Sequence, residues 1–506
     1  MARYAGPLQV TLASLAVVLL MLLQGIMLLL ALSDAQIGAG AATAIGADNY
    51  WTMLRSLDFR RAFINTLWVL GLAMAIIVPA GVVVQRFVGR GGRLRLLLLA
   101  AVIVPVAMPG ALGMLAWRST FDLLHLPLEH RWIVLPLFAV VQAWRAFPLA
   151  VAVRSAPIKL RRNTHMGLAG AVAAYWIVAD ISAVMLLTGG APYNATHMLA
   201  SWGYATTVTS GQVGLGAAMA MTLLVVLRLL GIALGWLAVQ LMLRREEDAA
   251  APQSRSVANV AVSPAPGRAQ LAGLAAVLLW LLVPLIVVIG QAGWPWQWGS
   301  ALRFLSLESG YAWWLSSTLL LAAGAALVTV WVAPTVAQWL VQRPVNARKA
   351  AGSGVLALVL TSLPVAFVPL LWLEDRISFL PSAVRLEVLY IAAVLCLGVG
   401  FAALAQARLK LDRWGLTAAL ALTALLVVTQ EFSNALALDT GTSQTLNSGM
   451  VNNLAFRADV TPATTALAIL LPSLLFGALY CALVWIIHKR RARGTEIPFA
   501  DWGRDA

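Results

Sequence analysis

The sequence predicts an all-α polytopic membrane protein with about twelve transmembrane helices, arranged as two parallel six-helix repeats. Composition, long uncharged apolar runs and a similarity between the two halves of the chain predict this class. Of the 506 residues, 61% are apolar and only 11% are charged, whereas a soluble globular protein carries about 25% charged residues. The composition therefore excludes an ordinary soluble enzyme, a disordered chain and a secreted disulfide scaffold.

The apolar runs predict the spans. The first run, 10–33, is longer than the roughly 18–20 residues that a helix needs to cross a bilayer. It also exceeds the apolar region of a signal peptide, so we expect a membrane anchor. Charged or turn-rich breaks separate the twelve expected spans. Their approximate extents are 9–32, 64–85, 96–117, 133–153, 166–187, 213–239, 271–291, 314–342, 353–372, 386–405, 415–437 and 463–487.

The basic residues predict the orientation of the chain. With the N-terminus inside, 24 of the 35 Lys and Arg residues fall on cytoplasmic segments and nine fall on the opposite side. Such an excess follows the positive-inside rule and predicts that both termini are cytoplasmic. The formal net charge of +15 is thus explained by topology, and we expect membrane lipid and no nucleic acid as a partner.

One linker divides the chain. Residues 244–270 are rich in Ala, Pro, Ser and charge and have no apolar periodicity, which is typical of a flexible tether. They separate a first six-span half, 1–243, from a second half, 271–488, followed by a cytoplasmic tail, 489–506. Since six spans return each half to the starting side, the halves should be parallel repeats.

Three pairs of short segments support the repeat. Each pair occupies corresponding spans, in the same order, at offsets of 251 to 259 residues. The pairs are Asn65-Thr66-Leu67 with Ser317-Thr318-Leu319, Pro105-Val106-Ala107 with Pro364-Val365-Ala366, and Ala179-Asp180-Ile181-Ser182 with Gln430-Glu431-Phe432-Ser433.

Four charged residues lie inside predicted spans. Because burying a charge in a membrane is costly, such residues usually face a cavity or a partner. Asp180 and Glu431 occupy matching repeat positions, so both could line a shared central pathway. Arg145 and Arg228 are the other two candidates. Alternatively, Asp180 pairs with one of these arginines and only fixes helix packing.

Four prolines also lie within spans, at Pro105, Pro109, Pro364 and Pro369. Each proline removes a backbone hydrogen bond, which is tolerated where neighbouring groups or a water-filled cavity satisfy the freed carbonyl. The prolines are therefore candidates for a translocation pathway, with a simple packing kink as the alternative. Gly211, Gly214 and Gly216 predict close packing where the sixth span begins.

No residue pattern indicates a resident metal or a catalytic site. Cys396 and Cys481 both lie in apolar spans, and the five histidines have no ligand spacing. A phosphate-binding loop of the G-x-x-x-x-G-K-S/T type does not occur in the sequence. We therefore expect no cofactor and no enzyme activity, and ATP could act only through a partner subunit.

Two segments of the first half carry a family resemblance. NYWTMLRSLDFRRAFINTL (49–67) resembles the segment before the second helix in permease subunits of binding-protein-dependent ABC importers. LTGGAPYNATHMLASWGYATTVTSGQVGLGA (187–217) resembles the T-GGP-x-N-A-T stretch of that family, and 431–469 is its fainter counterpart in the second half. A chain with two fused halves is similar to importers of iron(III), thiamine and related small solutes.

The resemblance implies a type I importer architecture in the bacterial inner membrane. It also implies an ABC ATPase subunit, as a dimer, and a periplasmic solute-binding protein as partners. The family contacts its ATPase through a cytoplasmic E-A-A–x–x–x–G loop, but 154–165 and 407–415 contain no E-A-A run. Basic residues in these loops could contact an acidic partner or could serve only topology. They are Lys159, Arg161, Arg162, Arg408, Lys410 and Arg413.

The leading hypothesis is a permease that moves a small solute by alternating access. The shortened loops favour a second hypothesis, a permease-derived scaffold that does not translocate. An ion-coupled secondary transporter, with Asp180 or Glu431 binding the ion, is a third.

Overall fold

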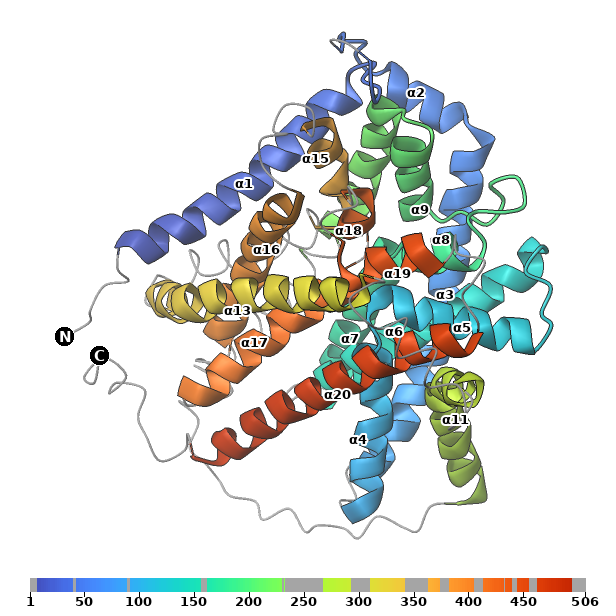
Figure 1. The fold of residues 1–506 in the computed structure, drawn as a ribbon, viewed down its shortest axis with the longest axis vertical. Helices are drawn as coiled ribbons and strands as arrows, with labels where there is room; N and C mark the ends of the chain where they lie inside the picture. The colour runs from blue at the N-terminus through green and yellow to red at the C-terminus, as the bar shows by residue number, and fades with distance from the viewer. Residues whose placement is uncertain are drawn as a thin grey trace.

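The computed structural model describes most of the chain, and all of its regular elements in that part are helices (Figure 1). One isolated antiparallel bridge joins Ser33 and Ala44. The described residues are 7–39, 42–88, 92–155, 162–229, 232, 267–292, 310–341, 363–373, 382–404, 413–431, 433–438, 444–454 and 462–493.

The first half contains three long helices that follow the predicted spans and several shorter ones. Two of the spans expected as continuous helices are broken. The elements are α1 (Pro7–Ala31), α2 (Asp48–Arg55), α3 (Leu57–Val88), α4 (Gly92–Ala107), α5 (Gly110–Leu123), α6 (Arg131–Ser155), α7 (Arg162–Ala179), α8 (Ser182–Leu187), α9 (Leu199–Tyr204), the π-helical turn η1 (Ala205–Thr209) and an apolar helix over Val213–Leu229.

The second half repeats this alternation of long and short helices. Its long final helix continues five residues into the predicted tail. The elements are α11 (Arg268–Gln291), α13 (Tyr311–Val341), the 3₁₀ turn η3 (Leu363–Val365), α15 (Phe367–Leu373), α16 (Ser382–Leu404), α17 (Arg413–Gln430), α18 (Ser433–Ala437), α19 (Leu446–Leu454) and α20 (Pro462–Arg493).

The chain is an all-α, membrane-embedded protein, which confirms that part of the prediction, while the twelve spans and the two repeats stay predictions. Among the described residues, six helices are long and apolar enough to cross a membrane. A seventh crossing is added if the bent pair α4 and α5 is counted as one span. The predicted linker, apart from its last residues, lies outside the described part of the chain.

The span predicted over 96–117 is wrong as a single helix. It divides at Met108–Pro109 into α4 and α5, which are bent by 105° relative to each other. Pro109 lies at the N-cap of α5, so its missing N–H is not needed by the new helix. Likewise 166–187 divides at Asp180 and 415–437 divides at Glu431. Hydropathy reports how apolar a segment is, and a break between two apolar helices leaves that value unchanged.

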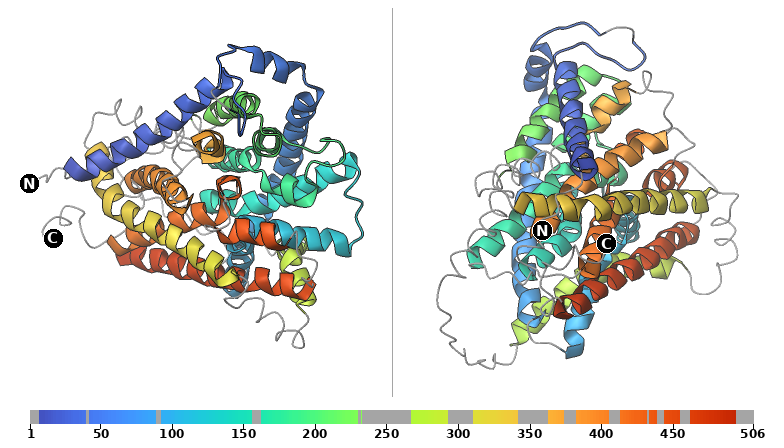
Figure 2. Two further views of the ribbon diagram at one scale, coloured as in Figure 1. Left: turned by 45° about the horizontal axis from the view of Figure 1, so that its top comes forward. Right: turned by 90° about the vertical axis from the view of Figure 1, so that its left-hand side faces the viewer.

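The two halves exchange their first helices. Helix α1 packs against α13, α15 and α16 of the second half, and α11 packs against α3, α4 and α5 of the first half as well as α20 of its own half. Both views in Figure 2 place α1 beside second-half helices. Each half therefore completes part of the other's packed interior.

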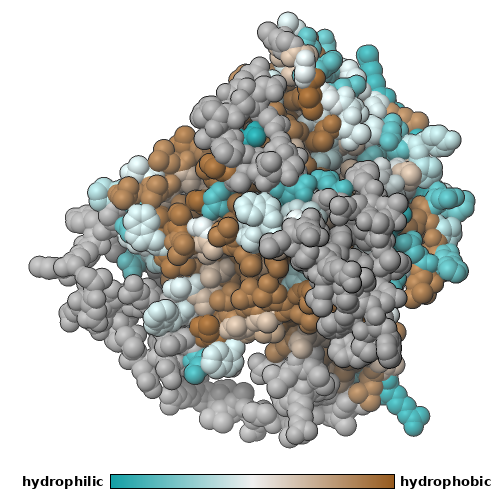
Figure 3. Space-filling view, in the orientation of Figure 1, coloured by the Kyte–Doolittle hydropathy of each residue, from teal (hydrophilic) through white to brown (hydrophobic). Residues whose placement is uncertain are grey.

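The outer surface is strongly apolar. In Figure 3, apolar side chains cover much of the face formed by α1 and α13, and polar side chains gather toward the top and right edges. Leu320 and Leu327 of α13 are 68% and 72% exposed. Exposed leucines in such numbers are expected of a surface that contacts lipid.

Candidate functional site: a central polar cluster

A buried ion pair forms the first-half side of the site. Helix α6 supplies Arg145, whose Nη1 atom pairs with Asp180 Oδ1 in the break between α7 and α8. The same Nη1 donates to Ser182 Oγ at 2.6 Å. Gln142, one turn before Arg145, donates through Nε2 to Asp180 Oδ2 at 2.7 Å. The structure thus shows the pairing that was the alternative for Asp180, with Arg145 and not Arg228 as the partner.

Asp180 also caps the short helix α8, which begins two residues later at Ser182. Its Oδ2 atom accepts a hydrogen bond from the backbone N–H of Ala183 at 3.1 Å. A carboxylate at a helix N-terminus satisfies an N–H that has no intrahelical partner. The Arg145 and Asp180 side chains are only 2% and 8% exposed. This pair therefore fixes both the break in the helix and the position of the charge.

Glu431 has the corresponding role in the second half. Its Oε1 accepts the backbone N–H of Asn434 at 2.8 Å, which caps α18 as Asp180 caps α8. Its Oε2 accepts a hydrogen bond from the hydroxyl of Tyr390 on α16 at 2.8 Å. Tyr390 thus contacts the second-half acid as Arg145 contacts Asp180. The two acids have the same local geometry with different partners.

Gln430 connects the second half to the bend between α4 and α5. Its Nε2 donates to the backbone carbonyls of Val106 and Met108, both at 2.9 Å. Arg145 Nη2 in turn donates to the carbonyl oxygen and to Oε1 of Gln430, at 3.4 and 3.5 Å. Carbonyls at a bend inside a membrane need donors from neighbouring helices. Gln430 provides them.

Asn447 of α19 makes a second connection between the halves. Its Oδ1 accepts the backbone N–H of Ala111 in α5 at 3.1 Å, and its Nδ2 donates to the carbonyls of Thr429 and Glu431. Gly110 permits the close approach, since a Cβ there would lie 2.8 Å from the Gln430 carbonyl oxygen. We call Arg145, Asp180, Gln430, Glu431 and Asn447 the central polar cluster.

The other residues that were predicted to line the pathway lie on several different helices and turns. Arg228, on the Val213–Leu229 helix, donates to Gln24 Oε1 of α1. Pro105 lies inside α4 and Pro109 precedes α5, so both are next to the central polar cluster. Pro364 lies in η3 and Pro369 in α15.

The candidate coupling residues cannot be placed as side chains. Lys159, Arg161, Arg408 and Lys410 lie outside the described residues. Arg162 and Arg413 are the first residues of α7 and α17.

Sequence reasoning missed two members of the cluster, Gln430 and Asn447, and also Tyr390, whose hydroxyl contacts Glu431. Gln430 had a usable signal, because it is a lone amide at the end of an apolar run and next to an intramembrane acid. Asn447 and Tyr390 had none, since asparagine and tyrosine also occur nearby at positions outside the site. Their roles depend on helix faces that a uniformly apolar span does not reveal.

Matching hydrogen bonds recur away from the cluster. The backbone N–H of Leu199 donates to Thr66 Oγ1 at 2.8 Å, and that of Leu446 donates to Thr318 Oγ1 at 2.8 Å. Ser201 and Ser448 each accept a backbone N–H from three residues earlier, at 2.9 and 3.1 Å. The offsets are 247 to 252 residues, close to those of the sequence pairs.

A loop over 188–198 packs against α3. Asn65 Nδ2 donates to the carbonyls of Ala195 and His197 at 2.9 and 2.8 Å, and Arg131 donates to Asn65 Oδ1 at 2.7 Å. Burial lowers the pKa of His197 to about 4, partly opposed by Asp58. The neutral ring Nδ1 lies 3.2 Å from Ser201 Oγ. His197 is therefore a structural residue of this loop at neutral pH.

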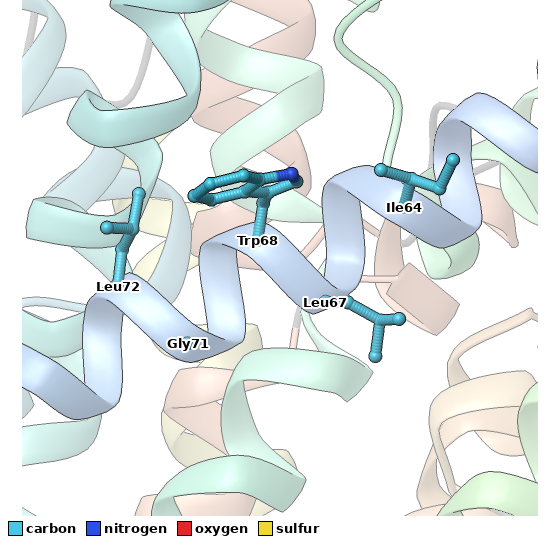
Figure 4. Close-up of a pocket in the computed structure, with 5 residues that line it drawn as sticks. All are labelled: Ile64, Leu67, Trp68, Gly71 and Leu72. Carbon is cyan, nitrogen blue, oxygen red and sulfur yellow. The ribbon is translucent and has the colours of Figure 1, made fainter.

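The surface hollow in Figure 4 is separate from the cluster. It has a volume of about 340 Å³ and is lined by α3 alone. Its lining residues are Ile64, Leu67, Trp68, Gly71 and Leu72. Ile64, Leu67 and Trp68 are about half exposed, so the hollow belongs to the outer apolar surface. No three His, Cys, Asp or Glu side chains in the described part of the chain are grouped to bind a metal ion.

Neither protein-family models nor curated protein sequences match this chain.

Proposed function

We propose that this chain is the membrane-spanning permease subunit of an ABC importer, with two fused six-helix halves in the bacterial inner membrane. In this proposal the chain has twelve spans and both termini are cytoplasmic. A separate ATPase dimer hydrolyses ATP, and a periplasmic binding protein delivers a small solute. The chain itself contributes the pathway.

The observation that carries the proposal is the central polar cluster between broken helices of both halves. A polar group inside a membrane protein usually marks a pathway or a moving contact, because burying it unpaired is costly. Here the bend between α4 and α5 meets the break after α17, through Gln430 and Asn447. Broken helices at a repeat interface are typical of transporter binding sites.

The matched hydrogen bonds support two halves of common design. Thr66 and Thr318 each receive an N–H from a short helix of their own half, and Asp180 and Glu431 each cap a short helix. The exchange of α1 and α11 between the halves also supports a two-fold arrangement. These features favour duplication over chance similarity of apolar segments.

Transport in this proposal follows from the contacts between the halves. In the arrangement described, hydrogen bonds close the centre, and Gly110 leaves no space for a Cβ beside Gln430. Closure of the ATPase dimer would rock the halves about their pseudo-two-fold axis and separate these contacts. Because Arg145 and Asp180 are paired within one half, that ion pair can remain intact during the motion.

ATPase stimulation in lipid nanodiscs tests the proposal. The chain would be co-expressed with the ATPase and binding-protein genes next to its own, and the complex isolated. We expect co-purification and an ATPase rate raised several-fold by the loaded binding protein. Replacing Lys159, Arg161, Arg408 and Lys410 by alanine should abolish the stimulation. The matched control, Arg244→Ala with Arg245→Ala, removes charge from the same predicted cytoplasmic side but outside these loops, and should preserve it.

Other outcomes identify the other functions. A complex with an ATPase but without stimulated hydrolysis or uptake would favour a membrane scaffold. Uptake driven by an ion gradient without ATP, and lost on Glu431→Gln, would identify an ion-coupled transporter. Either result would overturn the importer proposal.

A further inference from the structure

The side chains that hold the first-half bend to the other half belong to the second half. Gln430 and Asn447 belong to the second half, and both bond the backbone of the first-half bend. Gln430 corresponds to Ala179 of the first half, at the offset of 251 that relates Asp180 to Glu431. Asn447 corresponds to Ala200, at the offset of 247 that relates Leu199 to Leu446. An alanine side chain cannot donate or accept a hydrogen bond.

Arg145 also joins the halves, through its hydrogen bond to the Gln430 carbonyl at the break after α17. The first-half bend receives directional hydrogen bonds from Gln430 and Asn447.

The second-half bend is packed by an aromatic ring. It lies between η3 and α15, where Phe367 corresponds to Met108 at the offset of 259 that relates the proline segments. The ring of Phe367 contacts that of Tyr204 in α9, with centroids 5.2 Å apart and planes at 54°. Both residues are buried, at 2% and 3% exposure. Ring contacts tolerate sliding and rotation better than hydrogen bonds do.

We propose that Gln430 and Asn447 are positioning residues that lock the first-half bend to the second half, so that the bend before α15 is the hinge that moves first when the halves separate. The inference rests on the proposed two-half organisation for its choice of matching positions. It adds that the two bends move one after the other, whereas two bends held in the same way would move together. Hinges are commonly a few residues at the ends of elements, as at Ala366–Phe367.

Hydrogen exchange of the full chain in nanodiscs, followed by mass spectrometry, tests this inference. In the unaltered protein, amides at 108–113 should exchange more slowly than those at 366–371, because local opening governs exchange. Gln430→Met combined with Asn447→Ala removes three hydrogen bonds to the bend. We expect exchange at 108–113 to rise about tenfold or more. Exchange at 366–371 should change less than about twofold, because neither substitution removes a described hydrogen bond to that bend.

A matched control separates locking from general stability. Thr423→Ala alters the same helix as Gln430 but removes only a bond to Ala419 of that helix, at 2.9 Å. This control should leave 108–113 unchanged. Equal acceleration of both bends in the double variant, or no acceleration at 108–113, would overturn the inference.

A second variant tests the lock from the first-half side. Gly110→Ala would place a Cβ against the Gln430 carbonyl and 3.1 Å from Arg145 Nη2. It should accelerate exchange at 108–113 while both locking residues remain. Gly170→Ala is its control, because that Cβ meets only the flexible end of Met74, at 3.2 Å. These measurements need no ATPase, so a chain that fails to stimulate an ATPase could still pass them.

Discussion

At the scale of single residues, the Arg145–Asp180 pair should dominate stability. Arg145→Met leaves a buried carboxylate without its cation, which costs about 3–5 kcal/mol when a buried pair is broken. Unfolding by denaturant in detergent micelles would measure the loss. Arg145→Gln combined with Asp180→Asn should restore most of it, because no isolated charge remains. Arg61→Gln is the control, since its 3.7 Å pair with Asp58 is over 30% exposed and should contribute less than about 1 kcal/mol.

His197 predicts a pH dependence at the same scale. Burial lowers its pKa from 6.5 to about 4, so between these values the unfolded chain binds more protons than the folded chain. Stability should therefore fall as the pH drops below 6.5 and level off near 4. We expect a loss of about 2 kcal/mol between pH 7 and pH 5, measured by denaturant unfolding. His197→Gln should remove this loss, and His125→Gln, at an exposed position, should retain it.

At the scale of elements, the start of the Val213–Leu229 helix depends on glycine. A Cβ at Gly214 would collide with the Ser33 carbonyl and lie 3.0 Å from Asn49 Nδ2. Because the obstacle is backbone, Gly214→Ala should destabilise the protein by about 1–3 kcal/mol. Thermal unfolding would measure it. Gly25→Ala on α1 meets no atom within 4 Å and should be neutral or stabilising by up to about 1 kcal/mol. A comparable loss at both glycines would contradict this account.

The breaks in the helices show which features of an element a sequence pattern can predict and which it cannot. The prolines within the predicted spans predicted distorted helices, and the chain does bend at Pro109. Yet Pro79 in α3 and Pro284 in α11 also lie inside helices, which continue through them. A proline interrupts a span only where neighbours satisfy the released carbonyls. Whether Gln430 is placed to do so for Val106, 324 residues earlier, depends on the packing of the other half.

At the scale of the whole molecule, the exchanged first helices predict that the halves remain together without a covalent connection. A protease site inserted within the predicted linker, 244–270, would allow the purified chain to be cut. We expect the two fragments to co-elute in size-exclusion chromatography, because α1 packs on α13, α15 and α16 and α11 packs on α3, α4 and α5. A cut in the predicted tail, after Arg493, controls for the protease. Separate elution of the halves would contradict the prediction.

The sequence by itself determined the membrane class, because apolar length and scarce charge leave few other folds. It also marked Asp180 and Glu431 as matching positions, since an acid in an apolar span stands out whatever its surroundings. Only the tertiary structure decided that Arg145 is the cation of Asp180 and that Gln430 and Asn447 join the halves. Spans that are apolar on every side do not reveal which face meets which helix. Those contacts are set by close packing between segments hundreds of residues apart.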